Sequence, residues 1–193
     1  MLFRSAAKPD ARQSVLVVDL GCGTGCIGLS IAAAVPIAKV VLVDFSQEAL
    51  EVAKRNAARL EVEDRCEFRH ADAGDLSALE DLIGRVDLLV ANPPYIDPTD
   101  ERVSPCVRQF EPATALFAGA PGQKGLEEIR RWALTSRKLL SPSACTLFEI
   151  GDGQGEDVIQ IFRESGWPDV QLRRDLSNRE RMIVGLFEGE QHG

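Results

Sequence analysis

The sequence predicts an α/β fold in which a mostly parallel sheet of seven strands carries helices on both faces. Short apolar runs rich in β-branched residues alternate with segments of helical periodicity, which is typical of repeated strand–helix units. A glycine-rich turn joins the first run to the first helical segment. The chain has 193 residues, 45% of them hydrophobic, enough for one domain with a full core. We therefore expect a single domain over residues 1–193, with 1–13 as an irregular N-terminal segment.

The first two strand–helix units have the clearest pattern. Residues 15–20 predict the first strand, and the almost wholly apolar segment 27–35 predicts a helix buried against the sheet. Residues 40–44 predict the second strand, and Ser46 can cap the helix that follows it. The inner face of that helix is expected to consist of Ala49, Leu50, Val52, Ala53 and Ala57.

The middle of the chain is less regular. A third strand is expected near residues 66–70 and a weaker helix near 76–83. The fourth strand, 86–91, runs directly into Asn92. Residues 93–123 then contain six of the ten prolines and show no clear periodicity, so we expect a long loop of the functional or mobile kind.

The last third of the chain completes the sheet. A helix is expected over about 126–139, a strand over 145–150 and another helix over about 155–165. Residues 170–174 and 182–187 predict two closing strands, and the short connection between them allows an antiparallel pair. The last strand is therefore expected to run antiparallel to the others.

The composition limits the class of protein. The net charge of −8 and the lack of a basic stripe disfavour tight, sequence-independent binding to nucleic acid. No apolar run approaches the roughly 20 residues of a membrane span, and the first 13 residues lack the apolar stretch of a signal peptide. We therefore expect a soluble cytoplasmic protein that binds neither membranes nor, stably, nucleic acid.

The cysteines argue against a metal centre. The five cysteines form no C-x-x-C pair and only two histidines occur, a composition unlike that of zinc sites. An odd number of cysteines without a signal peptide predicts reduced thiols. Cys22 and Cys26 flank a glycine loop, where we interpret them as small residues that fill the loop.

Residues 19–25, Asp-Leu-Gly-Cys-Gly-Thr-Gly, end the first strand and open the first helix. Glycines let the backbone turn sharply and approach a ligand closely, and the crevice of such folds lies at the carboxyl ends of the strands. Asp44 ends the next strand, where its carboxylate can accept hydrogen bonds from both hydroxyls of a ribose. The residues expected to bind a cofactor here are Asp19, Gly21, Cys22, Gly23, Thr24, Gly25 and Asp44.

The glycine pattern fits two cofactors. The spacing G-x-G-x-x-G from Gly23 to Gly28 also satisfies the dinucleotide pattern, so a nicotinamide-dependent oxidoreductase is one interpretation. Asp19 favours S-adenosylmethionine instead, because a carboxylate beside the loop suits an ammonium and a sulphonium better than a pyrophosphate. Asp72, after the third strand, can accept from the exocyclic amine of adenine. The alternative is an ordinary loop aspartate; Asp75 is the expected cap of the next helix.

The tetrapeptide Asn92-Pro93-Pro94-Tyr95 can hold a planar nitrogen. An amide nitrogen is a poor nucleophile because its lone pair is delocalised, but its two N–H groups can donate to the Asn92 side-chain oxygen and the Pro93 carbonyl. These bonds strengthen as the nitrogen pyramidalises, which stabilises the transition state selectively. The prolines fix the carbonyl, and Tyr95 can stack on a flat amide or base. The alternative, a plain proline-rich turn, is disfavoured by the position directly after the fourth strand.

With both motifs placed, the chain resembles the class I methyltransferases and, more closely, the release-factor glutamine methyltransferases of the HemK family. The implied fold is the Rossmann-like class I methyltransferase fold. The resemblance covers roughly residues 14–187. It rests on 19–25, Asn92-Pro93-Pro94-Tyr95-Ile96-Asp97, Phe110-Glu111-Pro112 with Ala115-Leu116, Glu149-Ile150-Gly151 with Gln154, and Asp175-Leu176 with Asn178-Arg179-Glu180-Arg181.

The resemblance implies a cofactor, a substrate and roles for residues. Gly21 to Gly25 and Asp44 would bind S-adenosylmethionine, with S-adenosylhomocysteine as the product. Ala73 would lie near the adenine, and Asn92 would touch both cofactor and substrate. Residues 92–95 would hold the glutamine of the Gly-Gly-Gln loop of peptide-chain release factors. The asparagine–proline motif alone is shared with adenine and guanine methyltransferases, whereas the Phe-Glu-Pro segment and the arginine-rich turn at 178–181 favour glutamine.

Members of that family carry a helical domain ahead of the catalytic domain, and here only about 14 residues precede the first strand. We expect the helical domain to be absent, either because the chain is a truncated form of a longer protein or because it relies on a partner subunit. Two other functions stay open. One is methylation of an adenine or guanine amine in nucleic acid, and the other is cofactor binding without turnover.

Overall fold

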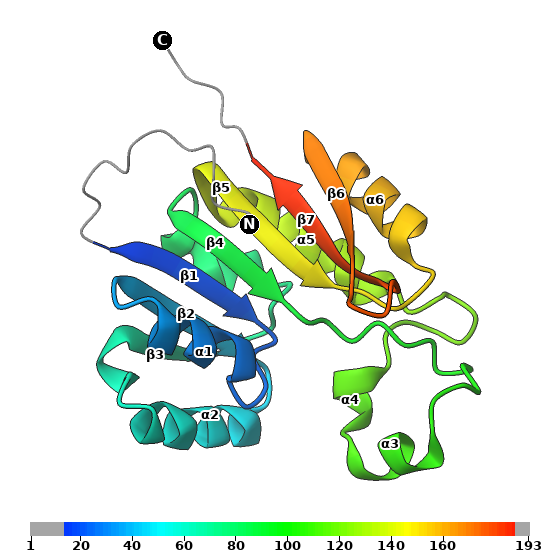
Figure 1. Cartoon of the computed structure of the whole chain (residues 1–193), viewed down its shortest axis with the longest axis horizontal. Coiled ribbons are helices and arrows are strands. Elements are labelled where there is room, and N and C mark those ends of the chain that lie inside the picture. Colours follow the sequence, from blue (N-terminus) through cyan, green and yellow to red (C-terminus); the bar gives the residue numbers. More distant parts are fainter. Residues whose placement is uncertain (1–13, 188–193) are drawn as a thin grey trace.

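The computed structural model describes residues 14–187, which form one seven-stranded sheet with helices on both faces (Figure 1). The strands are β1 (Val15–Leu20), β2 (Ala38–Asp44), β3 (Cys66–His70), β4 (Val86–Ala91), β5 (Leu140–Glu149), β6 (Asp169–Arg174) and β7 (Glu180–Leu186). The α-helices are α1 (Cys26–Ala34), α2 (Gln47–Arg59), α3 (Pro105–Phe110), α4 (Ala113–Leu116), α5 (Glu127–Leu139) and α6 (Gly155–Glu164). Two 3-10 helices are η1 (Glu63–Arg65) and η2 (Leu76–Leu82). The segment 1–13, for which we predicted an irregular structure, lies outside the described residues.

The strands lie in the order β3-β2-β1-β4-β5-β7-β6. The five strands from β3 to β5 in this order pair in parallel, whereas β7 is antiparallel to both β5 and β6. The reversal between β6 and β7 uses an aspartate-stabilised turn, in which Asp175 Oδ1 accepts from Ser177 N at 2.8 Å and Asn178 adopts a φ of +63°. The predicted seven strands and the antiparallel last strand are confirmed.

The sheet separates two hydrophobic cores, because alternate side chains of a strand point to opposite faces. Val17 of β1 packs in a cluster with Leu29 of α1 and Leu50 of α2. Its neighbour Val18 packs in the cluster on the other face, which includes Ile129 of α5 and residues of α6. The helices on both faces are therefore present as predicted.

Helix α2 shows how closely sequence pattern and packing agree. Ser46 caps the helix as predicted, because its Oγ accepts from Ala49 N at 3.1 Å. Of the five residues expected on the inner face, Leu50, Ala53 and Ala57 are buried, and Ala49 and Val52 are half-buried.

Residues 93–123 are not the plain loop that the sequence predicted. Ser104 caps α3 by accepting from Val107 N at 3.3 Å, and Pro105 stands in the first turn of that helix. Helix α4 follows after Pro112. Figure 1 shows α3 and α4 projecting beyond the carboxyl ends of the strands, apart from the sheet. We call residues 97–124 the excursion.

Two further elements differ in type or length from the prediction. The segment expected as a weak helix near 76–83 is the 3-10 helix η2, and Asp75 caps it as predicted. Strand β5 begins at Leu140 instead of Cys145. Pro142 and Ser143 break the apolar pattern there, and Ser143 has a φ of +65°, but the strand continues through them. No helix within residues 14–187 is long and apolar enough to cross a membrane.

Gly185 of β7 faces a filled part of the core, and a side chain there is expected to destabilise the fold. A Cβ at this position would lie 2.7 Å from Cε3 of Trp167 and 3.0 Å from Cγ2 of Thr146. We expect Gly185→Ala to lower the free energy of unfolding by about 1–3 kcal/mol, the usual effect of overpacking, measured by urea denaturation. Trp167→Phe removes part of the clashing ring, so Gly185→Ala is expected to cost less in that background. An equal loss in both backgrounds would contradict the explanation.

Candidate functional site

The ends of five neighbouring strands bring the predicted site residues to one edge of the sheet. Leu20 of β1 pairs with Val43 of β2 on one side and with Ala91 of β4 on the other. The residues that follow these positions, Gly21, Asp44 and Asn92, therefore emerge side by side. His70 pairs with Asp44 and Phe148 pairs with Ala91, which adds Ala71-Asp72 and Glu149 to the same edge.

The glycine loop is bound to the end of β2. Gly21 N and Cys22 N both donate to Val43 O, at 2.8 and 3.0 Å. Gly21, Gly23 and Gly25 have φ values of +66°, +54° and +85°, a region that residues with a Cβ adopt only under strain. Nothing lies within 4 Å of the position that a Cβ would take on Gly23. This part of the loop therefore offers open space to a ligand.

Asp44 holds the loop and keeps capacity for a ligand. Its Oδ2 accepts from Gly23 N at 2.7 Å and its Oδ1 accepts from Ser46 N at 2.8 Å. The side chain is buried. A carboxylate has about four lone-pair positions, so two remain for ribose hydroxyls in the predicted role.

Asp19 lies beneath the loop instead of beside it. It is 1% exposed, and its Oδ2 accepts from Gly28 N of α1 at 2.8 Å. A Cβ on Gly28 would come within 2.9 Å of that oxygen, so the close approach of helix and strand requires glycine. Burial raises the pKa of Asp19 to about 7; the Gly28 hydrogen bond opposes this, and the Asp44 charge adds to it. Asp19 therefore supports the loop from below through Gly28, and its predicted direct role in cofactor binding stays untested.

The loop after β3 engages α5. Asp72 Oδ2 pairs with Nη2 of Arg131 at 2.7 Å and its Oδ1 accepts from Gly74 N at 2.7 Å. Burial acts to raise the pKa of Asp72, but the hydrogen bonds from Arg131 and Gly74 outweigh it, so the pKa lies below its ordinary value. Ala73 is buried in the core. The expected contact between Asp72 and adenine stays a prediction, and it would share this carboxylate with Arg131.

Phe45 is a candidate that the sequence analysis did not identify. It directly follows Asp44, is 56% exposed, and its carbonyl oxygen lies 2.7 Å from Nε2 of His70. An exposed aromatic ring at this edge can stack on a flat heterocycle. Its position directly after the strand-ending aspartate was the signal that could have identified it.

Asn92 to Tyr95 directly follow β4 and differ in burial. The Asn92 side chain is exposed, Pro93 is buried, and Pro94 and Tyr95 are half-buried. Tyr95 Oη donates to Glu149 Oε1 at 2.9 Å. Burial first, and then the Glu149 carboxylate, raise the pKa of Tyr95 to about 12. The phenol is therefore neutral at physiological pH.

Gln154 closes the base of the excursion. Its Nε2 donates to Tyr95 O at 2.9 Å and to Lys124 O at 2.7 Å, and its Oε1 accepts from Gly151 N at 2.8 Å. Asp97 adds a second closure, because its two oxygens accept from Gly122 N and Lys124 N at 3.2 and 2.9 Å. The two ends of the excursion are therefore tied together next to Tyr95.

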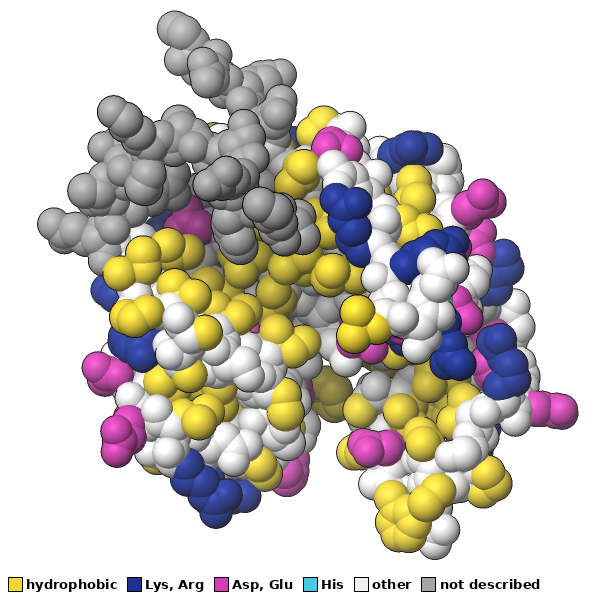
Figure 2. Space-filling model, in the orientation of Figure 1, with side chains coloured by type: hydrophobic (Ala, Val, Ile, Leu, Met, Phe, Trp, Pro, Cys, Tyr) yellow, Lys and Arg dark blue, Asp and Glu magenta, His cyan; other side chains and the backbone are white. Residues whose placement is uncertain are grey.

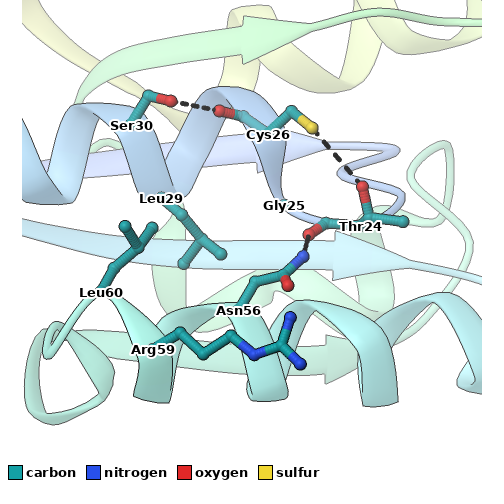
Figure 3. A pocket seen from close by; sticks show the side chains of 8 residues that line it. All are labelled: Thr24, Gly25, Cys26, Leu29, Ser30, Asn56, Arg59 and Leu60. Carbon is teal, nitrogen blue, oxygen red and sulfur yellow. Dashed lines mark hydrogen bonds between the residues drawn. The ribbon is translucent and has the colours of Figure 1, made fainter.

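A groove of about 340 Å³ lies between α1 and α2 on the outer side of the glycine loop (Figure 3). Asn56 of α2 crosses it and donates to Thr24 O at 3.0 Å, which supports the loop. Cys26 is exposed and lines this groove, so its interpretation as a loop-filling residue is wrong, whereas Cys22 is buried as expected. The lining consists of Thr24, Gly25, Cys26, Leu29, Ser30, Asn56, Arg59 and Leu60.

The thiols and carboxylates of the described part do not assemble into a metal centre. All five cysteines are free. No group of three or more His, Cys, Asp or Glu residues within 14–187 could hold a metal ion. Burial, together with the charges of Asp19 and Asp44, raises the pKa of Cys22 above the ordinary value, so that thiol stays protonated.

Comparison with known proteins adds the family. Residues 3–118 match the model of the methyltransferase small domain. The chain is 41% identical to the release factor glutamine methyltransferase of Streptomyces coelicolor, over 87% of this chain and 57% of the relative. It is 36% identical to that of Salmonella typhimurium, over 89% of this chain and 59% of the relative. The chain therefore spans somewhat more than half the length of these curated relatives.

A solved structure supports the fold. The chain superimposes on a predicted O-methyltransferase of Agrobacterium tumefaciens with a TM-score of 0.61 and 20% identity, covering 92% of this chain and 75% of the other. At this level of identity the likeness concerns the fold alone.

Gly21 and Gly23 are expected to differ in their tolerance of a side chain. Both need a positive φ, which costs a residue with a Cβ about 1–2 kcal/mol. A Cβ on Gly21 would also lie 2.5 Å from Cη2 of Trp132. We expect Gly21→Ala to lower the free energy of unfolding by about 1–3 kcal/mol more than Gly23→Ala, measured by urea denaturation. Equal losses would show that Trp132 does not pack against the loop.

Asp19 is expected to make stability fall as pH rises. Its pKa is about 7 in the folded chain and 3.8 ordinarily, so the folded state binds the proton more tightly. Its contribution to the free energy of unfolding therefore decreases between about pH 4 and 7 and is constant above that range. Asp19→Asn keeps an acceptor for Gly28 N but does not titrate. Denaturation at several pH values is expected to show that the free energy of unfolding of the variant rises relative to that of the parent chain across this interval. A difference that stays constant with pH would contradict this.

Proposed function

Because this chain belongs to the methyltransferase small domain family, we propose that it transfers a methyl group from S-adenosylmethionine to a glutamine side-chain amide of a peptide-chain release factor. The observation that carries the proposal is the meeting of the glycine loop, Asp44 and Asn92 to Tyr95 at one sheet edge. The names of the relatives support the acceptor. The acceptor glutamine would lie in the Gly-Gly-Gln loop of the factor.

The residues at the edge fit an adenosine-containing cation. Gly23 leaves open space, Asp44 has free lone pairs for ribose hydroxyls, and Phe45 offers an exposed ring for the adenine. The Asp44 carboxylate would place negative charge beside the loop, and Asp19 would add to it in its ionised form; both favour an ammonium and a sulphonium. When bound, S-adenosylmethionine supplies an electrophilic methyl group on a cationic sulphur.

The tetrapeptide would prepare the acceptor nitrogen. The Asn92 side-chain oxygen and the Pro93 carbonyl would accept from its two N–H groups, and both hydrogen bonds would strengthen as the nitrogen loses conjugation and gains positive charge. The Tyr95 ring would lie against the flat amide. Because the amide nitrogen becomes acidic once it has been methylated, its proton can leave to water without a strong base.

The oxidoreductase alternative fits the site less well. A pyrophosphate at the loop would lie close to Asp19, which would repel it in its ionised form. The sheet also differs from the usual dinucleotide-binding order, because β7 inserts between β5 and β6.

Nucleic-acid methylation is the second candidate, because the same motif could hold an adenine or guanine amine. The net charge of −8 disfavours it. On the face drawn in Figure 2, Lys and Arg side chains are interspersed with Asp and Glu and form no continuous stripe. Since the chain spans somewhat more than half of its relatives, capture of a whole release factor also belongs to the proposal, and a partner subunit could assist it.

The proposal predicts a specific loss of transfer in Asn92→Ala. With labelled S-adenosylmethionine and a purified release factor, we expect the variant to transfer at least about 100-fold more slowly, as when one transition-state hydrogen bond of an active site is removed. Replacement of the acceptor glutamine in the factor is expected to abolish labelling. Calorimetric titration of the variant with S-adenosylhomocysteine controls for folding and cofactor binding.

Each alternative has its own outcome. Labelling of nucleic acid but not of the factor would show that nucleic acid is the acceptor, and binding of that substrate would then depend steeply on salt concentration. Cofactor binding without labelling of any acceptor would support a binding protein without turnover. Tight binding of NADH, with no binding of S-adenosylmethionine, would contradict S-adenosylmethionine as the cofactor.

A further inference from the structure

Tyr95 is held from outside its own segment at two points. Its phenolic Oη donates to Glu149, the last residue of β5, at 2.9 Å. Its main-chain oxygen accepts from Gln154 Nε2 at 2.9 Å. Because Phe148 of β5 pairs with Ala91 of β4, Glu149 and Asn92 lie side by side at the ends of neighbouring strands.

Glu149 is itself placed by the antiparallel strand β7. It pairs with Met182, and the neighbouring Arg181 has Nη1 3.9 Å from Glu149 Oε1. Arg181 also donates to Ile150 O at 3.4 Å and has Nε 3.7 Å from Asp175 Oδ2. Oε1 of Glu149 therefore accepts from the Tyr95 phenol and lies close to the Arg181 guanidinium.

We propose that Glu149 is a positioning residue for methyl transfer, which aims the Tyr95 ring at the acceptor nitrogen by accepting the phenolic hydrogen bond. This inference rests on the proposed function. The Tyr95 ring is half-buried and packs against the core, which limits but does not fix its two side-chain angles. The bond fixes the direction of the ring, and because a phenolic O–H prefers the plane of its ring, the bond also restrains rotation about the ring axis.

Precise placement matters because the acceptor amide is weakly nucleophilic. Its lone pair must face the methyl group, and small errors of orientation reduce the rate steeply. The ring can restrict the amide to one plane only if the ring is itself fixed. Glu149 would therefore affect the rate of transfer more than the affinity for the cofactor, because most of the expected cofactor contacts lie elsewhere, at Gly21 to Gly25 and Asp44.

A double-mutant cycle separates this role from a general structural one. Tyr95→Phe and Glu149→Ala are each expected to lower kcat for factor methylation by about 10- to 100-fold, as for the loss of a hydrogen bond to a charged group. In the Tyr95→Phe background, Glu149→Ala is expected to add little, because the hydroxyl that it acts through is gone. The dissociation constant for S-adenosylhomocysteine is expected to stay within about twofold. Additive losses of kcat, or a matching loss of cofactor affinity, would overturn the inference.

Glu164→Gln is a matched control for loss of a carboxylate. Glu164 pairs with Arg130 at 2.8 Å on the surface between α5 and α6, away from Tyr95. We expect this variant to keep the kcat of the parent chain. A loss in Glu164→Gln equal to that in Glu149→Ala would show that net charge, not contact with Tyr95, sets the rate.

Tyr95 is the only tyrosine of the chain, so tyrosinate absorbance reports on it alone. Glu149→Gln removes the charge that helps to raise the pKa of Tyr95 to about 12, so ionisation is expected at lower pH than in the parent chain. A rapid pH jump, read before the chain unfolds, measures this without substrate. If Tyr95 ionises at the same pH in Glu149→Gln and in the parent chain, the contact between Tyr95 and Glu149 is contradicted. Absence of factor methylation by the parent chain, with a shifted titration, would instead overturn the proposed function.

Discussion

The parallel pairing of Leu20 with both Val43 and Ala91 is the constraint on which the candidate site depends. A slip of one residue would turn every side chain of β1 to the other face of the sheet. It would also separate Gly21 from Asp44 and Asn92. Because β1 and β2 are apolar on both faces, polarity alone does not fix this register. Specific contacts help to fix it: Gly21 N and Cys22 N donate to Val43 O, and Gly28 N donates to Asp19.

The loop that this register positions carries an electrostatic cost. Asp19 and Asp44 are both buried, and the pKa of Asp19 is raised, first by burial and to a lesser extent by the charge of Asp44. A chain selected only for stability would place apolar side chains there. Under the proposed function, a cationic cofactor at the loop would offset part of this cost. The hydrogen bond to Gly28 partly offsets the burial and joins α1 to the same carboxylate.

The sequence located those parts of the site that are local in the chain. The glycine loop, Asp44 and Asn92 to Tyr95 each follow a recognisable strand, and the end of a strand is a structural position that a pattern can predict. The contacts of these residues could not be predicted in the same way. Glu149 lies 54 residues from Tyr95 and Arg131 lies 59 residues from Asp72. Such pairs depend on how β5 and α5 pack, which no spacing encodes.

Helix α3 was not predicted, although the sequence contains a signal for its start. Ser104 followed by Pro105 is a helix start with a cap and a first-turn proline, but the surrounding prolines hid it. The helix is only six residues long and has no buried residue, so it shows no apolar period. Periodicity reports burial in a core, and the excursion is folded mainly by caps, turns and carboxylate contacts instead.

The excursion and the tetrapeptide meet at one junction, which is built around Gln154. Gln154 joins the Tyr95 and Lys124 carbonyls to Gly151, and a Cβ on Gly125 would collide with the Tyr95 carbonyl. The end of the excursion is thus packed directly against the tetrapeptide, and both are fixed to the start of α6. Phe110 of the excursion is 73% exposed, whereas Tyr95 of the tetrapeptide is held by Glu149 at the end of a sheet strand.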